Sequence, residues 1–223
     1  MLELLSNINY LELWEATQAT AQMLLWSLGF IVVLGLPLGI LMYSFADSRI
    51  KKIPILYHLL SFLINIIRSI PFIILMILLM PLTEWLTGTT IDVAGVIPPI
   101  TVAGIAFFAR LTETALQEVD HGVIEAAQSM GVNYWQMVTG VLLPEARAPI
   151  IAAITITAIA LVDYTAVSGV IGGGGLGDLA IRYGYQRYET EIMLVTVGLL
   201  ILIVQLMQLI GHSAVLYFSK KYT

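Results

Sequence analysis

Cysteine is absent from all 223 residues of the sequence. This absence excludes disulfide bonds, thiol catalysis and thiolate metal sites, although it does not identify the compartment. Charge is scarce as well, because Asp, Glu, Lys and Arg make up 11% of the chain, against roughly 25% in soluble domains. With a net charge of -5 and no basic patch, the sequence does not indicate binding to nucleic acid.

Apolar residues make up 59% of the sequence, and the mean hydropathy is +0.92. A chain of this length cannot bury so many apolar side chains in an aqueous core, so lipid is the expected solvent. Residues 1–223 are therefore expected to form a single transmembrane domain. The N-terminus lacks the basic region of a cleaved signal peptide, so we expect none.

The apolar runs predict about five membrane spans, each near the roughly 20 residues that a bilayer requires. They are expected at 19–43, within 54–82, and at 93–109, 149–170 and 192–213. The second run is too long for one perpendicular span and contains Arg68 and Pro71, which predicts a tilted or kinked helix. Uninterrupted apolar runs do not alternate as barrel strands do. The sequence therefore predicts an all-α membrane protein.

Basic residues predict the orientation, because loops rich in Lys and Arg stay in the cytoplasm. The N-terminal arm has no basic residue, whereas the first loop and the C-terminus have several: Arg49, Lys51, Lys52, Lys220 and Lys221. We expect a multi-pass protein of the cell inner or plasma membrane, with the N-terminus outside and the C-terminus in the cytoplasm. Arg182 and Arg187, in the fourth loop, are exceptions to this rule.

A long polar segment, about 111–147, separates the third and fourth spans. Its spacing predicts a short helix, a break at Gly131, a second short helix and a restart at Pro144. Gly131 is expected to adopt a positive φ and end the first helix. Each helix is expected to present an apolar face, formed by Val123, Ile124, Ala127 and Met130 and then by Trp135, Val138, Leu142 and Leu143. Such an L-shaped element can lie in a groove of a partner protein, or alternatively on the lipid surface.

The pattern Glu125-Ala126-Ala127, Gly131, Val141 and Leu143-Pro144 resembles the cytoplasmic coupling motif of the permease subunits of ABC importers. That family usually has isoleucine where Val141 stands. The resemblance implies that this segment joins the chain to an ATPase, with Glu125 holding a backbone or arginine donor. The residues it assigns to coupling are Glu125, Ala126, Ala127, Met130, Gly131, Leu143 and Pro144.

Three further stretches, 65–73, 169–177 and 183–185, resemble the methionine-uptake branch of these permeases. This resemblance implies the fold of an ABC type I importer permease, with five helices in each subunit of a homodimer. It also implies two cytoplasmic ATPase subunits that hold ATP and Mg²⁺, and an extracytoplasmic substrate-binding protein. The chain itself is expected to carry no cofactor and no enzymatic activity. Asp163 departs from the branch, which more often has a small neutral residue there.

Charged residues at membrane depth suggest a substrate path, because they are costly there and are usually functional. Arg68 either faces the path or extends to the inner interface. Asp163 could meet a substrate ammonium group, pair with Arg68 or Arg182, or stay protonated because of desolvation. The glycine-rich end of the fourth span forms either part of an outer gate or an ordinary flexible loop. The candidate residues for path and gate are Arg68, Asp163, Tyr164, Val167, Ser168, Gly172 and Gly175.

Two other patterns do not support a site. Gly172, Gly174 and Gly177 fit a dinucleotide-binding spacing, but they follow a membrane span and not a strand. His121 and Glu125 are one helical turn apart, and two ligands do not make a metal site. No catalytic residue and no metal ligand is therefore predicted.

The sequence thus predicts the permease subunit of an ATP-driven ABC importer that moves methionine into the cell by alternating access. A permease for another small amino acid or an osmolyte is the close alternative. An ATP-independent carrier or channel, and an intramembrane enzyme, are alternatives of a different class.

Overall fold

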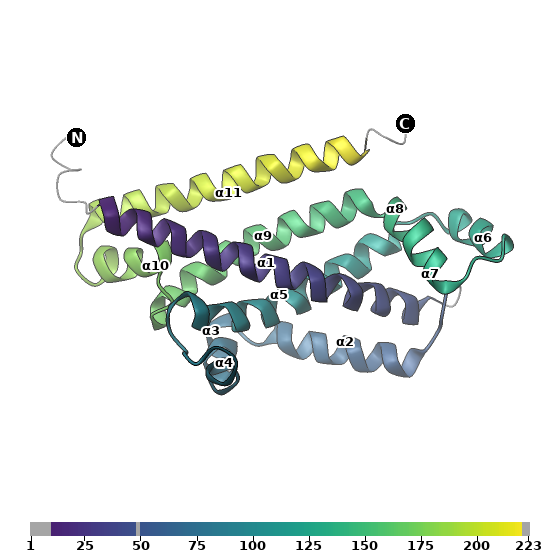
Figure 1. Cartoon of the computed structure of the whole chain (residues 1–223), viewed down its shortest axis with the longest axis horizontal. Helices are drawn as coiled ribbons and strands as arrows, with labels where there is room; N and C mark the ends of the chain where they lie inside the picture. Colours follow the sequence, from purple (N-terminus) through teal and green to yellow (C-terminus); the bar gives the residue numbers. More distant parts are fainter. Residues whose placement is uncertain (1–9, 48–49, 220–223) are drawn as a thin grey trace. The chain divides into compact units, whose positions relative to one another are not determined.

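The computed structural model describes residues 10–47 and 50–219, and within them every regular element is a helix (Figure 1). The described residues form two compact units, and the longest helices have residues in both. The first unit contains the residues up to Gly29, Ile70–Ala103 and Ala158–Gln208, and the second contains Phe30–Ser69, Gly104–Thr157 and the residues from Leu209. The prediction of an all-α membrane protein is confirmed.

Four helices are long and apolar enough to cross a membrane, or up to five if one bent pair counts as a single span. The four are α1 (Tyr10–Ala46), α5 (Asp92–Gln117), α9 (Arg147–Ser168) and α11 (Thr190–Ser219) (Figure 1). The bent pair is α2 (Pro54–Ser69) and α3 (Phe72–Leu78). The prediction of about five spans is therefore confirmed.

The break between α2 and α3 lies at Pro71, as the sequence predicts. Proline lacks the N–H that would continue the helix, and it disfavours a helical conformation of the preceding residue, Ile70. Pro71 becomes the N-cap of α3. A further short helix, α4 (Met80–Thr87), ends at Gly88, whose φ is 74°.

The first unit contains a core where α1 meets α10 (Gly175–Leu179). Ala16 of α1 packs against Leu176 and Leu179, and three residues of α11 lie around them: Leu199, Leu200 and Ile203. The backbone N–H of Leu176 donates to Thr20 Oγ1 over 2.9 Å at a buried position. This core and this hydrogen bond fix the glycine-rich end of the fourth span against α1.

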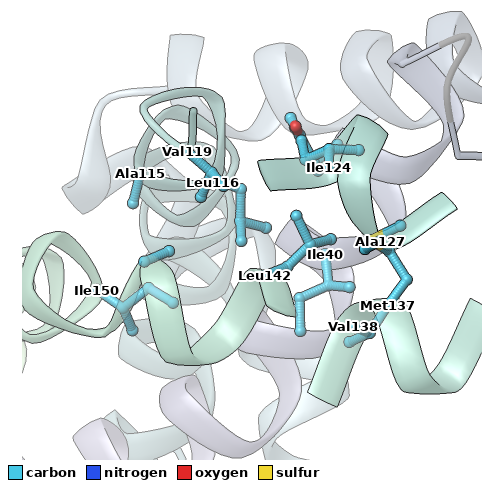
Figure 2. Close-up of a cluster of buried hydrophobic side chains, with 12 residues drawn as sticks. Ile40, Ala115, Leu116, Val119, Ile124, Ala127, Met137, Val138, Leu142 and Ile150 are labelled. Carbon is cyan, nitrogen blue, oxygen red and sulfur yellow. The ribbon is translucent and has the colours of Figure 1, made fainter. Parts of the chain in front are cut away.

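The second unit has its largest core around the polar segment between α5 and α9 (Figure 2). The segment contains α6 (His121–Ser129), α7 (Tyr134–Met137), the π-helix η2 (Val138–Leu142) and α8 (Leu143–Glu145). Ile124 and Leu142 from this segment are fully buried, together with Leu116 of α5. Ile40 of α1 and Ile150 of α9 belong to the same cluster. The polar segment is therefore fixed to the ends of three long helices.

We expect Gly39→Ala to lower the thermal stability of the protein, because α1 lies close against α5 at Gly39. A Cβ at Gly39 would lie 2.5 Å from Thr112 Cβ and 2.7 Å from the Ala109 carbonyl oxygen. Overpacking of this kind costs about 1–3 kcal/mol. Gly29→Ala on the same helix is the matched control, since a Cβ there meets nothing within 4 Å. The melting temperatures in detergent would be compared, and equal values for the two variants would contradict the close contact.

Candidate functional site

The polar segment forms the predicted pair of short helices. Asp120 caps α6 by accepting the N–H of Gly122 at Oδ1 over 2.6 Å. Gly131 ends that helix with a φ of 73°, which confirms the predicted positive value. Asn133 and Gln136 then form a reciprocal capping box at the start of α7, with bonds of 3.0 and 2.8 Å. Both helix starts thus follow from local side-chain to backbone hydrogen bonds.

The predicted apolar faces are divided between the interior and the surface. Ile124 and Ala127 are buried in the core of the unit, whereas Val123 and Met130 are exposed. On a helix of 3.6 residues per turn, Val123 and Met130 lie along one edge of the expected face and Ile124 lies at the other. The apolar face expected of the first helix is therefore only partly available to a partner, because half of it packs in the core of its own chain. The same holds for the second helix, where Val138 and Leu142 are buried but Trp135 is exposed.

We call five exposed residues of this segment the coupling surface, after the role that the sequence predicts for the segment: Val123, Glu125, Ala126, Met130 and Trp135. Met130 and Trp135 have 76% and 72% of their surface exposed, so two large apolar side chains of this segment are left largely uncovered by the described chain. Gly131 is exposed, and Leu143 and Pro144 are half-buried. Ala127 is 2% exposed and packs in the core, on the buried side of α6.

The indole ring of Trp135 packs against the neighbouring side chain of Tyr134. The Tyr134 ring meets it edge-on, with a centroid distance of 5.4 Å. The Tyr134 hydroxyl in turn shares a hydrogen bond of 3.2 Å with Ser44 Oγ of α1. The coupling surface therefore combines a carboxylate, at Glu125, with large apolar side chains, and Tyr134 joins it to α1.

The two charges predicted at membrane depth both lie on the surface of the subunit. Arg68 is exposed on α2, with its guanidinium carbon 6.0 Å from the centroid of the Phe107 ring. Asp163 is exposed on α9 and takes part in no ion pair among the described residues. Beside it, the ring of Tyr164 stacks on Phe72 at a centroid distance of 4.3 Å.

The remaining path candidates differ in exposure. Val167 is half-buried, whereas Ser168 is fully buried and donates to the Thr165 carbonyl oxygen over 2.7 Å. Gly172 is exposed, with a φ of 83°, and its carbonyl oxygen accepts the N–H of Asp92 over 2.9 Å. Gly175 is buried, with a φ of 81°. A Cβ on Gly175 would lie 2.6 Å from Thr20 Oγ1. Asp163, Tyr164 and Val167 thus share one stretch of α9, and Ser168 and Gly175 face the interior of the unit.

An ion-pair cluster that sequence reasoning missed surrounds Arg182 in the π-helix η4 (Ala180–Tyr185). Arg182 lies 2.7 Å from Asp178 and 3.4 Å from Glu12, and the Tyr183 hydroxyl donates to Glu12 over 3.0 Å. Burial lowers the pKa of Arg182, but the hydrogen bond and charge of Asp178 and the charge of Glu12 outweigh it and raise that pKa above its ordinary value. Among the described residues, Arg182 therefore pairs with Asp178 and Glu12, not with Asp163.

A second polar cluster, which was also missed, lies near the end of α5. The helix continues past residue 109, where the sequence predicts the end of the third span, and Arg110 pairs with Glu113 over 2.7 Å. The spacing of three residues between opposite charges was the available signal. Among the described residues, no group of three or more His, Cys, Asp or Glu side chains could hold a metal ion.

Comparison with known proteins gives consistent matches over most of the chain. Residues 35–223 match the family described as "Binding-protein-dependent transport system inner membrane component". The "Probable D-methionine transport system permease protein MetI" of Vibrio cholerae is 46% identical over 82% of this chain and 81% of that protein. The "Methionine import system permease protein MetP" of Bacillus subtilis is 42% identical over 92% of both chains.

Solved structures give the same picture. A chain of the MetNI methionine ABC transporter, in an inward-facing conformation, has a TM-score of 0.93 at 39% identity. That match covers 96% of this chain and 99% of the other. An amino acid ABC transporter crystallised with histidines has a TM-score of 0.74 at 23% identity, which supports the fold alone.

Proposed function

The chain belongs to the family of binding-protein-dependent transport system inner membrane components, and on that premise we propose that it is the permease subunit of an ABC importer that takes up methionine. The observation that carries this proposal is the 42% identity, over 92% of both chains, to a methionine import permease. The similarity in fold to a chain of a methionine ABC transporter, with a TM-score of 0.93, supports the same proposal.

The working transporter, in this proposal, contains two copies of this chain and two ATPase subunits. ATP and Mg²⁺ bind to the ATPase subunits, and the permease contributes no nucleotide site and no catalytic residue. A substrate-binding protein delivers methionine from the extracytoplasmic side. The coupling surface occupies a groove of the ATPase, where Met130 and Trp135 supply apolar contact and Glu125 accepts a hydrogen bond.

Transport follows from a shift between two conformations of the dimer, driven by closure of the ATPase subunits. Because Ile124, Ala127 and Leu142 are buried in one core with α1, α5 and α9, a displacement of the coupling surface moves the ends of these helices. Asp163, Tyr164 and Val167 of α9 line the substrate path in this proposal. Arg68 of α2 is a separate candidate, which either faces that path or extends to the inner interface. The glycine-rich end of the fourth span forms part of the outer gate in this proposal. Gly172 lies on its surface, and the buried residues Ser168 and Gly175 hold it in place.

We predict that Glu84 lies outside the cell, whereas Lys51 and Gln128 lie in the cytoplasm. Lys220, expected in the cytoplasm as well, lies outside the described residues. Because the chain has no cysteine, single substitutions to cysteine can be labelled without background. Glu84 and Gln128 are both exposed, so accessibility within the protein does not differ between them. An impermeant thiol reagent added to intact cells should label cysteine at 84 but not at 128, and the reverse result would invert the topology.

The experiment that tests the function is transport by the purified complex in vesicles, with the binding protein and ATP supplied. Methionine should accumulate in an ATP-dependent manner, and other small amino acids and osmolytes should not compete at equal concentration. Uptake of a different amino acid in preference to methionine would support the alternative substrate. Methionine uptake without ATP or ATPase would indicate a carrier or channel.

A further inference from the structure

The side chain of Arg110 connects α2 and α5 within one compact unit. From Nη1 it donates to Glu113 Oε2 over 2.7 Å, one turn further along α5. From Nη2 it donates to Ser61 Oγ over 2.8 Å and to Asn65 Oδ1 over 3.1 Å, both on α2. We call these four side chains the Arg110 clamp.

Glu113 fixes the direction of the guanidinium group. It is a carboxylate with only 1% of its surface exposed, and its Oε1 atom has no hydrogen bond among the described residues. Removing the cationic partner of a buried carboxylate is strongly destabilising, so the pair with Arg110 holds both groups in place. The guanidinium is planar and rigid. With Nη1 held by Glu113, Nη2 is directed toward Ser61 and Asn65.

The clamp lies on the part of α5 that leads into the polar segment between α5 and α9, which we call the coupling segment from here on. Seven residues of α5 follow Arg110, because the helix ends at Gln117, and α6 begins at His121. Leu116 lies in the core that also contains Ile124 and Leu142. The coupling segment is therefore fixed to α5 by an apolar core, and α5 is fixed to α2 by the clamp.

Apolar contacts also join α2 to its neighbours. Ile64 of α2 packs with Met42, Ala106 and Ala109. Such contacts are not directional, so they resist separation of the helices more than rotation or sliding. Hydrogen bonds from a charged fork are directional and short. The clamp thus adds directional contacts that help to set the rotation and register of α2 on α5.

We infer that the Arg110 clamp transmits the movement of the coupling segment to α2, and that Arg110 is a positioning residue for transport. This inference rests on the proposed function as an ATP-driven permease. When the ATPase subunits move the coupling segment, α5 and α2 move together as one body. Without the two bonds to α2, that helix follows incompletely, and ATP is hydrolysed without import.

The test changes α2 only, since substitution of Arg110 would leave Glu113 buried without its partner. The double variant Ser61→Ala, Asn65→Ala removes both acceptors on α2 and keeps the Arg110–Glu113 pair. Ser69→Ala is the control, because Ser69 donates to the Asn65 carbonyl oxygen within α2 and does not meet Arg110. In the reconstituted complex, we expect the methionine imported per ATP hydrolysed to fall roughly tenfold in the double variant, since both lost bonds involve a charged donor. ATPase docking should match that of the control, and the melting temperature should fall only modestly, because the same two bonds also contribute to stability.

A second measurement does not depend on the substrate. Spin labels on cysteines at the exposed positions Leu59 of α2 and Thr139 of η2 report the distance between α2 and the coupling segment. Labelled subunits would be diluted with unlabelled ones, so that pairs within one chain dominate. A non-hydrolysable ATP analogue should leave this distance unchanged in the wild type and should shift or broaden it in the double variant.

The two measurements distinguish failure of the proposed function from failure of the Arg110 clamp. If the wild type does not import methionine but the distances behave as expected, the substrate proposal fails and the clamp stands. An unchanged distance in the double variant, or unchanged import per ATP, would overturn the clamp. Loss of stability together with import, at a constant ratio of methionine to ATP, would also overturn it, because the clamp would then support only folding.

Discussion

Gly131→Val should weaken binding of the ATPase roughly tenfold while leaving membrane insertion and dimer formation intact. Gly131 has a φ of 73°, and a Cβ at this position would meet nothing within 4 Å. The effect therefore comes from the backbone alone, since a left-handed conformation costs an L-residue about 1–2 kcal/mol, and a β-branched side chain resists it further. The strain is relieved if the turn between α6 and α7 opens, which moves Met130 and Trp135 apart. Pull-down of the ATPase, normalised to the amount of permease in the membrane, measures the change.

Gly140→Val is the matched control for this experiment. Gly140 lies in η2 of the same segment, is exposed, and also has nothing within 4 Å of an added Cβ. Its φ is not positive, so valine introduces no left-handed strain there. Binding should stay close to the wild-type level in Gly140→Val and fall only in Gly131→Val. Normal binding and normal transport in Gly131→Val would refute the role of the bent pair of helices.

Local chemistry explains what the sequence could predict. Pro71 lacks an N–H and breaks the second apolar run, and Gly131 ends α6 because it tolerates a positive φ. These rules act over a few residues of chain, so they can be read without the fold. The number of apolar runs likewise depends only on the length needed to cross a bilayer.

Tertiary contacts explain what the sequence could not predict. Val123 and Ile124 are both apolar and adjacent, yet one is exposed and the other is fully buried. An amphipathic pattern is the same whether its apolar face meets the core of its own chain or a partner. The partners of Arg182 illustrate the same limit, because Asp178 is one turn away but Glu12 is 170 residues away in the chain.

Asp163→Asn should lower methionine transport by roughly tenfold or more per assembled complex, with ATPase docking unchanged. Asparagine nearly preserves the shape of the side chain and removes its charge. A hydrogen bond between charged groups contributes about 1.5–3 kcal/mol, so loss of a contact with the substrate ammonium group would reduce transport by that factor. Because Asp163 is exposed on α9 and is in no ion pair among the described residues, its replacement breaks no charge pair within the described part of the subunit.

Asp178→Asn separates this role from general destabilisation. Asp178 belongs to the same compact unit as Asp163, but its carboxylate lies 2.7 Å from Arg182 and accepts a hydrogen bond from it. Its substitution should lower the melting temperature of the complex while leaving transport per assembled complex close to the wild-type value. The opposite pattern is expected for Asp163→Asn, with a melting temperature near that of the wild type and reduced transport. If Asp163→Asn instead lowers stability and transport together, the carboxylate pairs with a cation of the assembled complex. If transport per complex is unchanged, Asp163 does not line the substrate path.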